Sequence, residues 1–276
     1  MRGLIFYLFL SFSFHNLQAQ STISYFNNMI KSISTIKTLK YELHAKELIN
    51  GEIFYTYSKV KLQKKPFCLY NYMIKPDLGV EVLFAHENKY ALVNPNGFPF
   101  INIKLDPSGE LIRKNQHHTL FDSGFDNFKD IVLSVLELIK KSPDKYIINL
   151  GVKQINNINC QVLHVINPDF YFSEYIVQKG ENIESIARKF NLSSYLILVE
   201  NNFSFYNDVT LGDEILIPNS YAEKFEIWID LQSSLPIVQK VFVNNKLFEH
   251  YEYKNIIINP EFSIDEFDKS NAEYNF

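Results

Sequence analysis

The residues with the clearest potential for chemistry are His117 and His118, which precede Asp122 in the chain. Imidazole nitrogens and carboxylate oxygens are common metal ligands. On an extended strand, however, adjacent side chains point to opposite faces, so the two histidines would not converge on one ion. No other His or Cys stands at ligand spacing from them. The pattern therefore predicts a polar loop before a helix, and neither a metal nor any other cofactor is expected.

The other titratable residues show no pattern that is typical of a catalytic centre. The chain contains neither a Gly-x-Ser-x-Gly nor a His-Glu-x-x-His motif. His44, His86, His164 and His250 stand singly within strand-like segments. Asp and Glu are plentiful, but no pair is singled out by its spacing, although carboxylates from distant segments can still meet in a fold. We therefore predict a protein that is not an enzyme.

Residues 175–218 form a self-contained pattern of local signals. Residues 175–178 alternate as in a strand, and Gly180 tolerates the positive φ of a tight turn. Asn182 is the predicted N-cap of a helix, because its side-chain oxygen can accept a bond from a free N–H at the helix start. The apolar residues of this helix recur at i, i+3, i+4 and i+7, as Ile183, Ile186, Ala187 and Phe190.

The second half of this segment repeats the sequence of cap, helix and strand. Ser193-Ser194 is a second N-cap candidate before the apolar run 195–199. A turn at 211–213 leads to a strand over 214–217, and Pro218 ends it because proline has no N–H to donate. The predicted order is β-α-α-β, with the two strands paired antiparallel and both helices on one face.

This segment resembles a LysM module, a small bacterial domain that binds glycans containing N-acetylglucosamine. The family opens with Tyr-x-Val-x-x-Gly-Asp-Thr-Leu, continues to Ile-Ala and an Asn after the second helix, and closes with Gly-x-x-Leu-x-Ile-Pro. The residues in register are Tyr175, Val177, Gly180, Ile183, Ile186, Ala187, Asn201, Gly212, Ile215, Ile217 and Pro218. Asp-Thr is replaced by Glu181-Asn182, and the Asn-Pro of the second loop is Asn201-Asn202.

The resemblance implies that the sugar lies in a shallow groove between two loops. Backbone N–H and C=O groups there would bind the acetamido group, over an apolar floor for its methyl. The residues that the resemblance assigns to this site are Gly180, Glu181, Asn182 and Ile183 in the first loop, and Asn202, Phe203, Ser204 and Phe205 in the second. In a purely structural interpretation, Gly180, Asn182 and Asn201 are only turn and cap residues. This interpretation is compatible with glycan binding, because the same residues can serve both roles.

The N-terminal residues 1–19 read as a secretory signal peptide, with one basic residue, an apolar run and a small-residue exit at Ala19. The run from Leu4 to Phe14 is shorter than the ~20 residues that cross a bilayer. No Cys lies near the exit to carry a lipid anchor, and no later run is long enough to span a membrane. We expect an exported protein of the periplasm or cell envelope.

Composition narrows the class of protein further. The formal net charge is −4, which argues against nucleic acid as a partner, because nucleic acid selects basic faces. Aromatic residues make up 15% of the chain, as suits a β-rich core. Cys68 and Cys160 could form a disulfide in an exported protein, or remain two buried thiols; both interpretations stay open.

The rest of the chain predicts an α+β fold. Helical patterns cover residues 23–39 and 128–139, and strand patterns separated by turns such as Asn50-Gly51 fill most of the remainder. Together they indicate one curved antiparallel sheet, a half-barrel with helices packed on it. The flanks ending at Phe172 and resuming at Tyr221 read as neighbouring strands, so the LysM-like unit at 175–218 is inserted into a discontinuous domain of residues 20–172 and 221–276.

This outer domain resembles an uncharacterised bacterial family of exported proteins related to the LolA-like lipoprotein carriers. The segments that carry the likeness are 66–70, 76–83, His117-His118 before 122–124, 228–230 ahead of Leu235-Pro236, and 249–253 with 267–268 and 274–276. LolA-like domains are half-open barrels with a helical lid over an apolar cavity. The resemblance implies that lipid or lipoprotein is a second class of partner.

These observations lead to one prediction with two alternatives. The prediction is a non-catalytic envelope protein that binds peptidoglycan or a chitin-like glycan through its LysM-like unit. The first alternative is a periplasmic carrier or scaffold for lipid or lipoprotein, with that unit as a tether only. The second is a degenerate module that mediates protein contacts.

Overall fold

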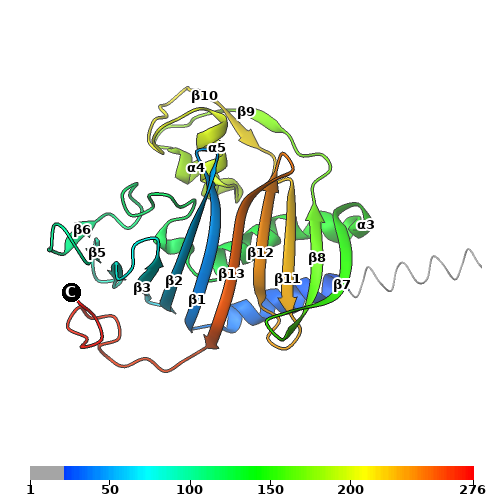
Figure 1. Ribbon diagram of the computed structural model, residues 1–276. Coiled ribbons are helices and arrows are strands. Elements are labelled where there is room, and N and C mark those ends of the chain that lie inside the picture. The colour runs from blue at the N-terminus through cyan, green and yellow to red at the C-terminus, as the bar shows by residue number, and fades with distance from the viewer. Residues whose placement is uncertain (1–21) are drawn as a thin grey trace, which may run out of the picture.

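The computed structural model describes residues 22–276, so the predicted signal peptide at 1–19 lies outside the described residues. Most of the described chain forms an antiparallel sheet of 11 strands in the order β6-β5-β4-β3-β2-β1-β13-β12-β11-β8-β7 (Figure 1). Its strands are β1 Thr38–Ile49, β2 Glu52–Lys64, β3 Phe67–Lys75, β4 Glu81–Phe84, β5 Ala91–Asn94, β6 Ile103–Leu105, β7 Ile147–Ile155, β8 Ile158–Ile166, β11 Lys224–Asp230, β12 Pro236–Val243 and β13 Lys246–Ile258.

The sheet is open, since β6 and β7 stand at its two ends and are not neighbours in the strand order of the described residues. Its longest hairpin, β1–β2, turns at Asn50-Gly51, where both residues have positive φ, as a two-residue turn of this type requires. Strand β6 is only three residues long, and Phe100 just before it has a φ of 57°, which interrupts the extended backbone. The curved antiparallel sheet is as predicted.

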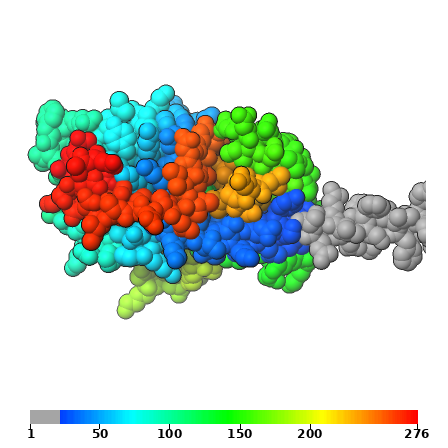
Figure 2. Space-filling view, turned by 90° about the horizontal axis from the view of Figure 1, so that it is seen from below, coloured from blue at the N-terminus to red at the C-terminus, as the bar shows by residue number. Residues whose placement is uncertain are grey.

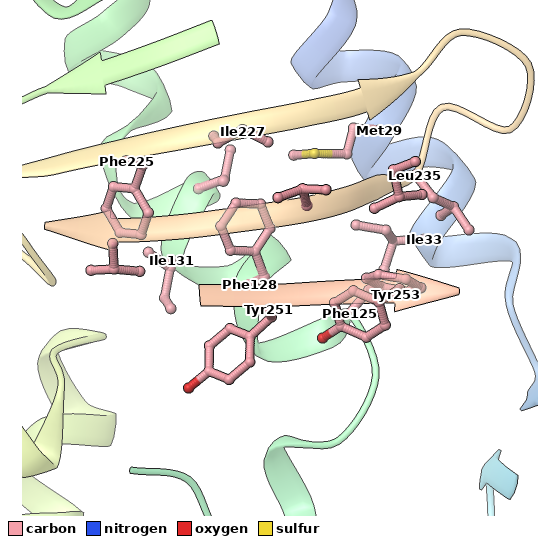
Figure 3. Close-up of a cluster of buried hydrophobic side chains, with 14 of the residues drawn as sticks. Met29, Ile33, Phe125, Phe128, Ile131, Phe225, Ile227, Leu235, Tyr251 and Tyr253 are labelled. Carbon is pink, nitrogen blue, oxygen red and sulfur yellow. The ribbon is translucent and has the colours of Figure 1, made fainter. Parts of the chain in front are cut away.

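Two helices pack on one face of the sheet and supply much of its core. Residues 22–35 are helical, and α2 spans Asp126–Lys141. Phe26, Met29 and Ile33 from the first helix and Phe128 and Ile131 from α2 are buried with the inward side chains of β11 and β13 (Figure 3). Burial of each large apolar side chain contributes roughly 1.5–3 kcal/mol, so these helices are held mainly by their apolar faces.

The first helix ends earlier than the predicted Leu39. Leu39 instead pairs with Leu62 of β2 and Ile258 of β13, because its side chain completes the buried row of β1. Two short elements were not predicted: a 3-10 turn, η1, over Leu120–Asp122 and a helix, α3, over Pro143–Tyr146. Within residues 22–276 no helix combines the length and apolar character that a membrane crossing needs.

Between β8 and β11 the chain leaves the sheet and forms β9 Phe172–Ile176, α4 Ile183–Phe190, α5 Ser194–Glu200 and β10 Glu214–Pro218. Strand β9 pairs with β10 in a separate two-stranded sheet. Strands β8 and β11 pair directly with each other, as in the register Leu163↔Ile227. We call residues 172–218 the insert; Figure 1 shows it at the upper edge of the sheet, where the Tyr195 hydroxyl accepts a 3.1 Å bond from the Asn50 N–H at the β1–β2 turn.

The C-terminal segment returns across the sheet to β3 and β4. The Tyr274 ring stacks on Tyr70 with centroids 3.8 Å apart, and the Asn275 N–H donates to the Glu81 carboxylate at 3.1 Å. Figure 2 shows this red segment lying against the cyan strands. It therefore covers part of the sheet surface that would otherwise be open to solvent.

Both cysteines are free thiols and both are buried. Burial raises the pKa of Cys160 to about 11 and also raises the pKa of Cys68. Of the two interpretations left open, the structure has the pair of buried thiols, which pack as small apolar residues.

Candidate functional site

The first helix of the insert, α4, begins where the sequence predicts. Asn182 is its N-cap, with the side-chain oxygen accepting from the Ser185 N–H at 2.8 Å, and the Ser185 hydroxyl accepts from the Asn182 N–H in return. Asn191 ends the helix in a left-handed conformation with a φ of 54°. Ser193 caps α5 by accepting from the Leu196 N–H at 3.3 Å. These caps fix the directions in which the neighbouring loops leave the two helices.

The first predicted glycan loop is a tight turn whose acidic side chain faces the insert itself. Gly180 has a φ of 80°, and a Cβ atom added there would meet nothing within 4 Å. The Glu181 carboxylate forms a 2.9 Å ion pair with Lys189 and accepts from the Gln178 N–H and the Tyr175 hydroxyl. The hydrogen bond from Lys189, followed by the bond from the Gln178 N–H, lowers the pKa of Glu181. Glu181 therefore mainly stabilises the turn.

The second predicted loop is ordered by an acidic residue that follows it. The Asp208 carboxylate accepts from the N–H groups of Ser204 at 3.0 Å and Phe205 at 2.8 Å. Asn202 adopts a φ of 57°, and Phe203 packs against the apolar core of the insert. The Phe205 side chain is 56% exposed. This loop thus exposes an aromatic ring to solvent, on a backbone that is held by hydrogen bonds to Asp208.

The structure brings the two loops together through contacts that the sequence did not reveal. The Ile183 N–H donates to the Tyr206 carbonyl at 3.0 Å, and the Asn182 side-chain amide donates to the Asn207 side chain at 2.9 Å. We call residues 180–183 and 202–207 the loop pair. All eight predicted site residues lie in it, but the Ile183 side chain is fully buried in the insert core. Tyr206 and Asn207 thus belong to the loop pair, although the family pattern did not mark them.

A second concentration of polar groups lies at the junction of the insert and the sheet. We call it the junction cluster; its members are Glu47, His117, His118, Asp122, Tyr221, Glu249 and Tyr251. Two of its carboxylates, Glu47 of β1 and Glu249 of β13, stand directly opposite each other in the sheet register. Like charges in that position repel, so buried partners have to offset them.

His117 is the partner that bridges the two carboxylates. Its backbone N–H donates to Glu47 at 3.0 Å, and its Nδ1 lies 2.9 Å from Glu249 Oε1. The hydroxyls of Tyr251 and Tyr221 donate to Glu47 and Glu249 at 2.6 and 3.0 Å. The loop before α2 is present as predicted, but His117 within it is only 2% exposed, because strand register places two carboxylates beneath it.

His118 faces the same carboxylate from the other side. Burial alone would lower the pKa of His118, but the hydrogen bond to Glu249 and the charges of Glu249, Asp122 and Glu47 outweigh it and raise that pKa to about 9. Burial would likewise raise the pKa of Glu249, yet the two histidines lower it to about 2. At neutral pH Glu249 is thus an ionised hydrogen-bond acceptor and His118 a cation.

Two cavities adjoin this cluster. One, of about 110 Å³, lies on the inner face of the sheet beneath α2, where Leu43, Val60 and Phe128 line it together with Glu47 and Glu249. The other, of about 180 Å³, lies between the insert and the sheet and is lined by polar groups such as Arg188, Ser193 and Asp122. His118, Asp122 and Tyr221 line both. Among residues 22–276 no three His, Cys, Asp or Glu side chains are arranged to hold a metal ion.

Comparison with protein-family models gives two adjacent matches. The family described as "Protein of unknown function (DUF1571)" matches residues 36–175, and the LysM domain matches residues 175–218. The first match ends where the second begins, and strands β11–β13 lie beyond both. No curated protein matches the chain.

Solved structures similar to this one include a mycobacterial lipoprotein. Lipoprotein LppX of Mycobacterium tuberculosis is 7% identical over 88% of this chain and 98% of that one, with a TM-score of 0.45. LprF of Mycobacterium bovis is 9% identical over 90% and 98%, also with a TM-score of 0.45. A LolA superfamily protein from Nitrosomonas europaea is 10% identical over 88% and 96%, with a TM-score of 0.33. These likenesses concern the fold alone.

The DUF1571 match covers the chain from the end of the first helix into β9. It includes His117 and His118 of the junction cluster. It spans about half of the sequence. The chain therefore belongs to the DUF1571 family of proteins of unknown function, and it carries a LysM domain that follows the family match directly.

Proposed function

We propose that this protein is an exported, non-catalytic protein of the cell envelope that binds peptidoglycan or another N-acetylglucosamine-containing glycan through its LysM domain. The observation that carries the proposal is the LysM match over 175–218, because LysM domains are glycan-binding modules. The geometry supports it, since the loops that would hold the sugar meet in the loop pair and expose Gly180 and Phe205.

The proposal includes the organisation of the chain. The outer domain comprises residues 20–172 and 221–276, and the LysM domain at 175–218 is inserted in it. Direct pairing of β8 with β11 supports this division, because the sheet continues across the point of insertion. Export, with residues 1–19 as signal peptide, would place the LysM domain where cell-wall glycan is accessible.

Binding to insoluble peptidoglycan tests the proposal. The mature protein is expected to pellet with peptidoglycan, and Gly180→Trp is expected to abolish pelleting, because a large side chain would occupy the space beside the first loop. Gly180→Ala is the matched control: it carries the same strain of a positive φ, on the order of 1 kcal/mol, without the bulk. If the wild-type protein stays in the supernatant while a known binder pellets, glycan binding is refuted.

The second candidate function is carriage of lipid or lipoprotein, with the LysM domain as a tether. The observation that favours it is the partly apolar cavity beneath α2. Its volume of about 110 Å³ is smaller than the roughly 150 Å³ that holds one benzene molecule, so an acyl chain does not fit in this cavity. The buried charges of Glu47 and Glu249 in its wall oppose an apolar guest further. A second cavity beside α2 is larger, about 290 Å³, and Val135, Leu138 and Phe225 are among its lining residues.

Native mass spectrometry of the purified mature protein distinguishes the two candidates. Because the proposed ligand is a glycan held by the LysM domain, we expect the mass of the bare chain without co-purified lipid. A bound species of lipid mass that survives purification would contradict this expectation and favour the carrier function.

A further inference from the structure

Tyr206 connects the loop pair to a part of the chain outside the LysM domain. Its carbonyl accepts from the Ile183 N–H of the first loop, while its own N–H donates to the Glu110 carboxylate at 2.9 Å. The guanidinium of Arg113 lies over its ring, 3.7 Å from the ring centre. Both Glu110 and Arg113 belong to the segment between β6 and η1 of the outer domain. One residue of the second loop is therefore held from two sides at once.

Arg113 is itself held firmly, which makes it a rigid support. It is 4% exposed, and its Nη1 forms a 2.9 Å ion pair with Glu184 in the first turn of α4. Its Nη2 donates to the Ser194 hydroxyl at 3.1 Å and to the His117 carbonyl. The same guanidinium thus contacts both insert helices and the junction cluster. A planar, forked donor set of this kind is specific to arginine.

We propose that Glu110 and Arg113 of the outer domain are positioning residues for the glycan, because they set the conformation in which the LysM loop pair receives it. The inference rests on the proposed glycan-binding function. A loop that is ordered before binding loses less conformational freedom when the ligand arrives, so its affinity is higher. The affinity of this LysM domain is then partly encoded outside its own 44-residue match, in residues 110 and 113.

The test uses Glu110, which is half-buried and accepts a backbone bond from Tyr206. Glu110→Leu removes the acceptor, whereas Glu110→Gln keeps a carbonyl oxygen in its place. We expect Glu110→Leu to weaken binding of a soluble N-acetylglucosamine oligomer roughly five- to tenfold in titration calorimetry, and Glu110→Gln to restore most of it. Glu87→Leu, an exposed change in the loop between β4 and β5, is the matched control and should leave the affinity unchanged.

Thermal unfolding of each variant separates positioning from general loss of stability. The positioning role predicts weaker binding well below the melting temperature, in a protein that is still fully folded. Arg113→Lys, which keeps the charge but loses the planar contact with Tyr206, is expected to weaken binding in the same way. If the wild type binds and Glu110→Leu binds equally well, the inference is overturned; equal weakening by leucine and glutamine would also overturn it. A wild type that binds no oligomer refutes the proposed function instead.

Discussion

Replacing Glu249 with leucine is expected to lower the free energy of unfolding by about 3–5 kcal/mol. Glu249 is 1% exposed and is the shared partner of His117, His118 and Tyr221. Removing it leaves the His118 imidazolium, the His117 ring and the buried Tyr221 hydroxyl without their acceptor, and such groups cost far more when unpaired than the pair contributes when intact. Urea unfolding of the mature protein at pH 6 measures the change.

Glu252→Leu provides the matched control for this prediction. It is the same residue type on the same strand, but it pairs with Lys254 at 3.2 Å on the outer face of the sheet. Partly exposed ion pairs contribute roughly 0–1 kcal/mol, so this change should be small. A Glu249→Leu variant as stable as Glu252→Leu would show that the junction cluster does not stabilise the fold.

The second large effect is a dependence of stability on pH, with a maximum between about pH 4.5 and 6.5. The pKa of His118 is raised from 6.5 to about 9, so its contribution is complete below pH 6.5 and is lost as the pH rises through 9. The pKa of Glu249 is lowered from 4.5 to about 2, so its contribution is complete above pH 4.5 and is lost as the pH falls through 2.

The contribution lost at alkaline pH and the contribution lost at acid pH each amount to on the order of 3 kcal/mol of unfolding free energy, because a tenfold change in a protonation constant corresponds to about 1.4 kcal/mol. The two contributions arise from one interaction and are not additive. Urea unfolding across this pH range is the measurement, with His118→Gln as the comparison. The variant should lose the alkaline contribution and keep only that part of the acid contribution that His117 provides. Parallel curves for the wild type and His118→Gln above pH 6.5 would contradict the assignment.

The insert was predicted from sequence because its signals are local. The cap at Asn182, the turn at Gly180 and the apolar face of α4 all fall within one stretch of the chain, and each is decided by neighbours a few residues away. The contact between its loops was not visible in the same way. It depends on Tyr206 and Asn207, which contact the first loop because the chain after α5 folds back beside it. Their residue types alone do not indicate this contact.

The junction cluster lay beyond sequence reasoning for a different reason. Glu47 and Glu249 are about 200 positions apart, and they meet only because β1 and β13 are neighbours in one particular register. A signal was present: Leu39, Tyr41 and Ala45 alternate as a buried row, and Glu47 continues it with a charge. A charged residue at a core position of a strand indicates a buried partner, but it does not say which one.

By itself the sequence determined the order of the main elements, the curved antiparallel sheet and the presence of a LysM domain, because hydrophobic periodicity, caps and turn residues act over short distances. Only the tertiary structure decided which partners the histidines and carboxylates contact and how the two loops of the loop pair meet. Strand register and the docking of the insert bring together residues from β1, β13, the 106–118 segment and α4, and the energies of those contacts depend on burial that no local pattern specifies.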